Sequence, residues 1–107
     1  LAQGIGQVLL ERTVYDESGQ LLTASFLDYA MPRADDLPSF RIETVAGIPA
    51  PGNALGAKGA GELGCVAAPP ALMAAILDAL RPLGVRDLDM PATPERVWRA
   101  IQAARGR

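Results

Sequence analysis

A glycine-rich stretch in the middle of the chain constrains the fold more than any other feature. Residues 47–64 contain six glycines and two prolines, a density that neither a regular helix nor a regular strand tolerates well. Loops longer than about 12–15 residues are uncommon in compact domains and are often functional. The sequence therefore predicts a long irregular loop here, with regular elements before and after it.

Apolar residues recur at helical spacing near both ends of the chain, whereas alternating apolar and polar residues indicate strands in its first half. We therefore expect an α+β fold of about three helices and three to four strands. The predicted helices are Ala2–Arg12, a second that Pro69-Pro70 open and that Pro82 and Gly84 end, and a third that begins at Thr93-Pro94. The predicted strands are Thr13–Tyr15, Gln20–Phe26 and Ser39–Ala46, with the turn Asp16–Gly19 between the first two and a short fourth strand at Leu83–Asp89 as an open alternative.

Composition excludes several classes of function. The chain has 107 residues with ten basic and twelve acidic side chains, so no basic excess is available to neutralise a phosphate backbone, and we expect no nucleic-acid partner. It has no histidine, which excludes Ser-His-Asp catalysis and histidine-based metal sites within this chain. Its one cysteine, Cys65, excludes an internal disulfide and a Cys-rich cluster site. A lone cysteine in apolar surroundings is more often a small buried residue than a nucleophile.

Length and terminal residues suggest part of a larger protein. A chain of this size is one domain or a piece of one. It begins at Leu1, and its first residues resemble the inside of an element, so we expect residues 1–107 to be a single subdomain of a longer polypeptide. No apolar run approaches the roughly 18–20 residues of a membrane span, so we expect no membrane span and, by default, a cytoplasmic location.

The second half of the glycine-rich loop is the strongest candidate for a site. In Gly56–Gly64, small residues surround the charged residues Lys58 and Glu62. Glycine lets a ligand approach the backbone N–H groups, and a carboxylate with free space around it suits a general base. The alternative is a flexible surface loop with two solvated charges. The loop lacks the Gly-Lys-Ser/Thr ending of a Walker A phosphate loop.

Two glutamines, Gln3 and Gln7, lie four residues apart on one face of the first predicted helix. Each amide offers two donors and an acceptor, which suits phosphate or the edge of a heterocycle. Taken alone, an ordinary polar helix face is the simpler explanation. Gly4 and Gly6 weaken a helix by about 1 kcal/mol each, so we expect another surface to approach the backbone closely at these positions.

Five segments occur in an order that resembles one protein family. They are Ala2–Gln7, Phe26–Ala34, Gly56–Glu62, Ala68–Ala71 and Met90–Val97. Together they resemble the C-terminal part of the molybdenum-binding large subunit of the xanthine dehydrogenase family, in its branch of aerobic carbon monoxide dehydrogenase large chains. The order of five segments makes the resemblance specific, and it covers nearly the whole chain.

The resemblance implies a role for each candidate residue. Glu62 matches the glutamate beside molybdenum that acts as general base, and Gln3 matches a glutamine near the oxo ligand of the metal. No residue of this chain is implied as a ligand of the metal itself. The other implied cofactor-binding positions line the pterin and its pyrophosphate or surround the ligands of the metal; they are Gly4, Gly6, Gln7, Lys58, Gly59, Ala60 and Gly61.

The resemblance also implies the cofactor and the partners. The cofactor is a molybdopterin with molybdenum, as the cytosine dinucleotide in bacterial members, and iron–sulfur clusters and FAD lie only on partner domains or subunits. The partners are the remainder of the large subunit, the iron–sulfur and flavin subunits and a small-molecule substrate. The implied activity is oxidation of a small carbonyl, heterocyclic or CO-type substrate with water-derived oxygen. We expect activity from the complete enzyme and none from the isolated chain. The alternative is a non-catalytic α+β module for docking or assembly.

Overall fold

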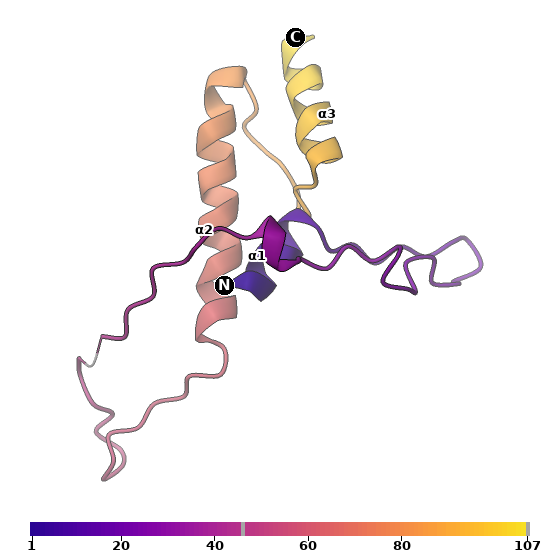
Figure 1. Cartoon of the computed structure of the whole chain (residues 1–107). Coiled ribbons are helices and arrows are strands. Elements are labelled where there is room, and N and C mark those ends of the chain that lie inside the picture. Colours follow the sequence, from indigo (N-terminus) through magenta and orange to yellow (C-terminus); the bar gives the residue numbers. More distant parts are fainter. Residues whose placement is uncertain (46, 107) are drawn as a thin grey trace.

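Three α-helices form the centre of the molecule, and the computed structural model describes residues 1–45 and 47–106 (Figure 1). The helix α1 spans Ala2–Leu9, α2 spans Leu63–Leu80 and α3 spans Pro94–Arg105. Two short 3-10 helices lie in the connections, η1 at Ala34–Asp36 and η2 at Arg81–Leu83. The three helices predicted from the sequence are therefore confirmed, although two of them have different bounds.

The close approach of α1 to α2 depends on Gly4. Gly4 is buried, and a Cβ added to it would lie 2.7 Å from the Cβ of Ala68 and 3.3 Å from the Cδ of Pro69. Any side chain at this position would therefore push the two helices apart. The prediction that a second surface meets the glycines of α1 is confirmed here.

Gly6 allows an equally close contact on another side of α1. A Cβ there would lie 2.8 Å and 2.9 Å from Cδ and Cγ of Pro32, in the segment that returns toward α1. The same segment is held by Tyr29, whose hydroxyl donates a hydrogen bond of 2.7 Å to Oε2 of Glu11. This hydrogen bond raises the pKa of the Tyr29 hydroxyl above its ordinary value. The chain that follows α1 is thus tied back to it.

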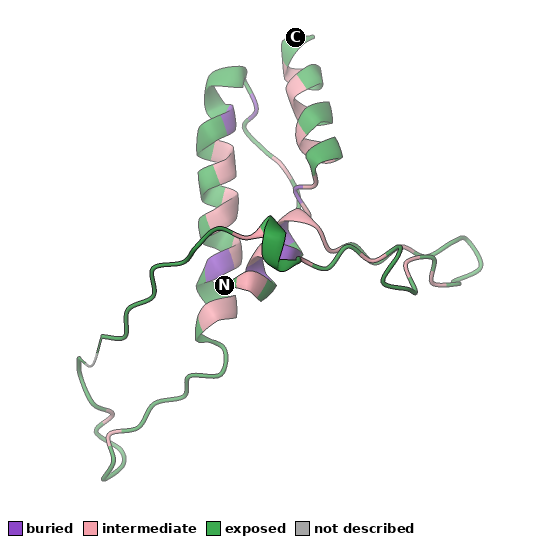
Figure 2. Cartoon of the chain, viewed as in Figure 1, coloured by how far each residue is buried: buried purple, intermediate pink, exposed green. Residues whose placement is uncertain are grey.

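The buried core is small and is spread along the facing sides of the helices. Val8 at the end of α1 is 0% exposed, and its carbonyl accepts a hydrogen bond from the N–H of Ala92. This bond satisfies a carbonyl that the end of a helix otherwise leaves without a partner. Figure 2 shows the few buried residues scattered along the facing sides of the helices and the segment between them. The buried apolar residues among those described are Val8, Ala68, Leu80, Val85 and Ala92.

The second helix begins at Leu63, six residues before the predicted start at Pro69-Pro70. The prediction placed proline in the first turn, where its missing N–H is harmless. Here both prolines lie inside α2, a position that removes backbone hydrogen bonds and costs about 3 kcal/mol. Contact of the Pro69 ring and Ala68 with α1 helps to offset that cost.

The predicted end of α2 and the predicted start of α3 are confirmed. After η2 the chain turns at Gly84, whose φ of 85° lies in the left-handed region that glycine adopts without strain. The side chain of Thr93 accepts a hydrogen bond from the N–H of Arg96, and Pro94 occupies the first helical position. Both features follow the ordinary rules for helix ends.

The predicted strands are not found in the described residues, so this part of the chain is helical rather than α+β. Tyr15 and Leu21 form one isolated antiparallel bridge. The turn between them is as predicted, with Gly19 at φ 84° and Oδ1 of Asp16 accepting from three donors, which lowers the pKa of that carboxyl.

An alternating pattern becomes a strand only when a neighbour supplies backbone partners and a surface for the apolar face. Residues 39–45 have neither within the described part of the chain. In the hairpin, the N–H of Leu22 donates to the carbonyl of Val14 at 2.8 Å, but pairing does not continue along residues 23–26. In residues 83–89, Val85 is buried but no second strand lies alongside. The last residue of the third predicted strand, Ala46, lies outside the described residues.

The expectation that no apolar segment is long enough to cross a membrane is also wrong. By length and composition alone, the helical segment Leu63–Leu83 of 21 residues could do so. The core helix of a soluble protein passes the same test. Ala68 and Pro69 in this segment lie directly against Gly4 of α1, so part of its surface is packed against protein.

Two arms project from the helical centre in different directions (Figure 1). The hairpin arm is residues 13–30, and the glycine arm is residues 37–61. Both arms are largely exposed (Figure 2), and they carry apolar side chains such as Phe26 at 87% and Leu55 at 91% exposure. The radius of gyration is 18.2 Å, against about 13 Å for a compact domain of 100 residues. The accessible surface is 8525 Å², against roughly 5,700 Å² for a compact protein of this mass.

We expect Gly4→Val to destabilise the chain by about 1–3 kcal/mol, because the added methyl groups overpack the contact with Ala68 and Pro69. Urea unfolding, followed by the helical circular dichroism signal, measures the change. The matched control is Gly52→Val, because a Cβ at Gly52 meets no atom within 4 Å. Equal stability of the two variants would show that the helices are not closely packed.

Candidate functional site

Glu62 lies at the junction between the glycine arm and α2. It is the N-cap residue of that helix, and its carbonyl accepts hydrogen bonds from the N–H groups of Cys65 at 3.0 Å and Val66 at 3.1 Å. Its side chain is exposed and caps no N–H group of the helix. The backbone of Glu62 is therefore fixed by α2, while its carboxylate is left available.

An open hollow of about 580 Å³ adjoins this carboxylate. Glycines leave one side of the hollow without side chains, and the first turns of α2 supply apolar side chains on the other. A carboxylate at the edge of an apolar hollow can accept a proton from a bound molecule. The lining residues are Gly59, Ala60, Gly61, Glu62, Leu63, Val66 and Ala67.

Asn53 shapes the glycine arm before it reaches the hollow. Its amide donates to the carbonyl of Ala57 and accepts from the N–H of Ala57, both at 2.9 Å. The turn is closed by Gly56, which has φ 63° and lies against Pro49. Sequence reasoning missed Asn53, although asparagine in a glycine- and proline-rich loop is a known signal for such a side-chain turn.

Gln3 is brought to the same end of α2. The thiol of Cys65, on the first turn of that helix, donates to Oε1 of Gln3 at a distance of 3.1 Å. A Cβ added to Gly64 would lie 3.0 Å from the backbone N of Leu1, so the start of α1 lies directly against the start of α2. The predicted glutamine and the helix that Glu62 caps thus meet, although 62 residues separate the two bonded side chains.

The other candidate residues divide into two groups. Gly4 and Gly6 are buried by packing against the chain itself, so their contacts explain both glycines. Gln7 and Lys58 are exposed and make no side-chain hydrogen bond to another described residue. The residues between Lys58 and Glu62, which are Gly59, Ala60 and Gly61, are exposed as well.

The backbone N–H groups of the loop, the glutamine amides and the ammonium group of Lys58 suit an anion better than a metal ion. The N–H groups of Gly59, Ala60 and Gly61 have no partner among the described residues, and free backbone donors together with amide and ammonium groups bind phosphate. No cluster of three His, Cys, Asp or Glu residues that could hold a metal ion is found among the described residues. A metal here would therefore need ligands from the cofactor that carries it.

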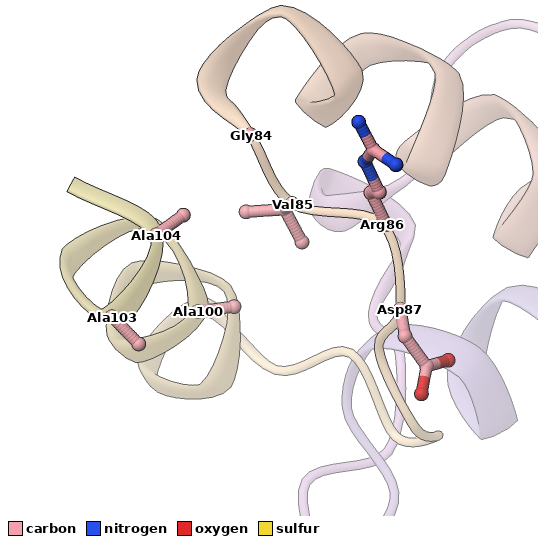
Figure 3. A pocket seen from close by; sticks show the side chains of 7 residues that line it. All are labelled: Gly84, Val85, Arg86, Asp87, Ala100, Ala103 and Ala104. Carbon is pink, nitrogen blue, oxygen red and sulfur yellow. The ribbon is translucent and has the colours of Figure 1, made fainter. Parts of the chain in front are cut away.

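A second hollow, of about 470 Å³, lies between α3 and the segment after η2 (Figure 3). Val85 and Ala104 face each other across it, while the side chains of Arg86 and Asp87 point away from α3 (Figure 3). It adjoins the opposite end of α2 from Glu62, and a helix of 18 residues is about 27 Å long. This hollow is therefore separate from the candidate site.

Comparison with a protein family identifies the first part of the chain. Residues 1–38 match the molybdopterin cofactor-binding domain family. The match includes the whole of α1, with Gln3 and Gln7, and the hairpin arm.

Comparison with individual proteins extends the likeness to nearly the whole chain. The large subunit of nicotine 6-hydroxylase from Paenarthrobacter nicotinovorans is 46% identical over 102 residues, which are 95% of this chain and 12% of that protein. The carbon monoxide dehydrogenase large chain from Hydrogenophaga pseudoflava is 33% identical over 102 residues, 95% of this chain and 13% of that protein. The crystal structure of quinoline 2-oxidoreductase from Pseudomonas putida 86 matches with a TM-score of 0.88 at 45% identity, over 96% of this chain and 13% of that one. The chain thus spans about an eighth of the length of these relatives.

We expect Asn53→Ala to loosen the glycine arm by removing both hydrogen bonds to Ala57. A net contribution of about 0.5–1.5 kcal/mol per bond predicts that the Ala57 amide exchanges with deuterium at least 2- to 10-fold faster. Hydrogen exchange resolved to single residues measures this. Asn53→Asp is the matched control, because it keeps the acceptor for the Ala57 N–H; exchange as fast as in Asn53→Ala would contradict the assignment.

Proposed function

Because this chain belongs to the molybdenum-binding large subunits of the xanthine dehydrogenase family, we propose that it forms one wall of a molybdenum hydroxylase active site, with Glu62 as the general base. In this proposal Gln3, Gln7 and the loop Lys58–Gly61 contact the molybdopterin cofactor. Gly4 and Gly6 let α1 lie close enough to its neighbours to place both glutamines.

The contact between α1 and the start of α2 supports this proposal most directly. Gln3 and Cys65 are bonded at 3.1 Å, and Glu62 caps the helix that carries Cys65. A glutamine and a glutamate that are remote in sequence thereby reach the same end of α2. A surface loop with two unrelated solvated charges gives no reason for this meeting.

The chemistry of the residues fits a pterin cofactor that carries phosphate. Neutral amides and unpaired backbone N–H groups can donate to its oxygen and nitrogen acceptors, and Lys58 adds a positive charge. When bound, the cofactor supplies the redox centre and makes a water-derived oxygen nucleophilic near neutral pH. The cytosine dinucleotide form belongs to the proposal as well.

Within such a site the task of Glu62 is to receive a proton. Its side chain is exposed and makes no capping hydrogen bond, and α2 holds its backbone in place. With the cofactor bound, a carboxylate oxygen of Glu62 would accept the proton of the water-derived oxygen as that oxygen bonds to the substrate carbon. The hydrogen and the two electrons of the substrate C–H bond that breaks would go to the cofactor. The apolar first turns of α2 and the bare glycine backbone leave space for the substrate beside it.

We propose an N-heteroaromatic compound as the substrate, rather than carbon monoxide or a simple carbonyl compound. Two of the relatives at 45–46% identity are named for nicotine and quinoline, whereas a carbon monoxide dehydrogenase large chain is 33% identical. Leu63 and Val66 are exposed beside Glu62 in the hollow. An apolar wall suits a flat ring better than a diatomic molecule.

The remainder of a large subunit would cover the two arms. Their conformation agrees with a segment of a crystal structure that is about eight times longer, at a TM-score of 0.88. The exposed apolar residues of the arms, such as Leu27 at 93%, form the kind of surface that marks a protein interface. Electron transfer would use iron–sulfur and flavin subunits, and we place the enzyme in the cytoplasm.

We expect Glu62→Gln in the complete enzyme to reduce the rate of substrate oxidation by about 10²–10⁴-fold, because the change keeps size and hydrogen bonding but removes the base. Rapid-reaction measurement of enzyme reduction by the substrate, with molybdenum and pterin content determined in parallel, tests this.

Glu17→Gln is the matched control, because Glu17 lies exposed on the hairpin turn and should leave the rate unchanged. A fully loaded Glu62→Gln enzyme with near-normal turnover would rule out the base and favour the docking or assembly module. Loss of cofactor would instead indicate that Glu62 holds the loop.

The isolated 107-residue chain should bind far less than one molybdenum atom per molecule and have no hydroxylase activity. It supplies only one side of the proposed active site. Its arms should bind the fluorescent dye anilinonaphthalene sulfonate, whereas the complete subunit should bind much less. Mass spectrometry of the metal and dye titration measure both. Stoichiometric molybdenum on the chain alone would contradict this expectation.

A further inference from the structure

The thiol of Cys65 holds one end of the Gln3 side-chain amide. Its thiol lies on the first turn of α2, is partly buried, and donates to Oε1 of Gln3 at 3.1 Å. Within the described part of the chain this is the one side-chain hydrogen bond that joins α1 to α2. The thiol engages the acceptor end of the amide, so both N–H groups of Nε2 remain free.

The terminal torsion of a glutamine side chain has a broad, roughly two-fold preference. Without a fixed partner, either the oxygen or the nitrogen of the amide can face a given direction. A cofactor rich in oxygen acceptors needs the nitrogen end. A partner that donates to the oxygen end therefore favours the useful orientation.

We infer that Cys65 is a positioning residue for Gln3, which turns the Nε2 donors of the amide toward the cofactor. This inference rests on the proposed function, because it assigns Gln3 to the cofactor. The position requires a small donor, since Gly4 and Gly64 bring the two helices into close contact on either side of it. A thiol meets both requirements.

The experiment compares Cys65→Ala, Cys65→Ser, Gln3→Ala and the double variant Cys65→Ala/Gln3→Ala in the complete enzyme. Loss of one neutral hydrogen bond of about 0.5–1.5 kcal/mol predicts that Cys65→Ala lowers the rate of enzyme reduction by about 2- to 10-fold. Cys65→Ser keeps a small donor and should restore the rate. Asp78→Asn, an exposed change later in α2, controls for changes in the helix itself.

Two readouts separate positioning from a general loss of structure. If Cys65 acts through Gln3, the double variant is no worse than Gln3→Ala, because the two changes are not additive. In a crystal structure of the Cys65→Ala enzyme, the Gln3 side chain should occupy more than one orientation. Molybdenum content should fall in Cys65→Ala no further than in Gln3→Ala.

Three results would each overturn the inference. They are additive effects of Cys65→Ala and Gln3→Ala in the double variant, a Cys65→Ser enzyme as impaired as Cys65→Ala, and a Gln3 side chain that keeps its orientation in Cys65→Ala. So would a Cys65→Ala enzyme that loses molybdenum while Gln3→Ala retains it. Failure of the proposed function is a different result, namely a fully active Glu62→Gln enzyme. An inactive Glu62→Gln enzyme with unimpaired Cys65→Ala would reject the positioning role alone.

Discussion

The contact of Gly4 with Ala68 and Pro69 is the constraint on which the rest of the structure depends. It lets the backbone of α1 at Gly4 lie directly against the side chains of Ala68 and Pro69 on α2. Helix packing at this distance gives many small dispersion contacts and allows a side chain at the start of each helix to reach the other. The Gln3–Cys65 bond follows from this geometry, as does the position of Gln3 at the end of α2 that Glu62 caps.

The hairpin and glycine arms stand in contrast to this centre. Their backbones are ordered by local turns, such as those at Asp16 and Asn53, rather than by burial. Apolar side chains that lie on exposed arms gain nothing from the hydrophobic effect until another surface covers them. The excess of accessible surface over that of a compact protein is therefore a property of the arms, and it agrees with a segment that makes up 13% of a solved relative.

Local rules of sequence predicted the features that depend only on neighbouring residues. The cap at Thr93, the stop at Gly84 and the turn at Gly19 were all predicted in this way. The prediction of strands was wrong because pairing is a property of two segments, and an alternating pattern says nothing about where its partner lies. The predicted start of α2 was wrong for a related reason, since tertiary packing around Ala68 outweighs the preference of the two prolines for the first turn of a helix.

In the candidate site, too, some residues could be predicted from the local sequence and others could not. The glycine loop and Glu62 could be found from composition and length and Gln3 from its spacing to Gln7, while the resemblance supplied the role of each residue. The importance of Cys65 could not be found, because its partner is 62 residues away and a lone cysteine is ordinarily an inert core residue. Its half-exposed position and its bond to an amide become visible only in three dimensions.

The hydrogen bond from Ala92 to the carbonyl of Val8 has a consequence for the order of folding. It joins one of the first helical residues to a segment near the other end of the chain, so the first helix emerges from the ribosome long before the residues that enclose it. Contacts of such high sequence separation form slowly, because the intervening chain loses its freedom before the contact stabilises anything. Within this segment, the helix that carries Gln3 and Gln7 is therefore synthesised before the residues that enclose it and reaches its final environment only after they have followed.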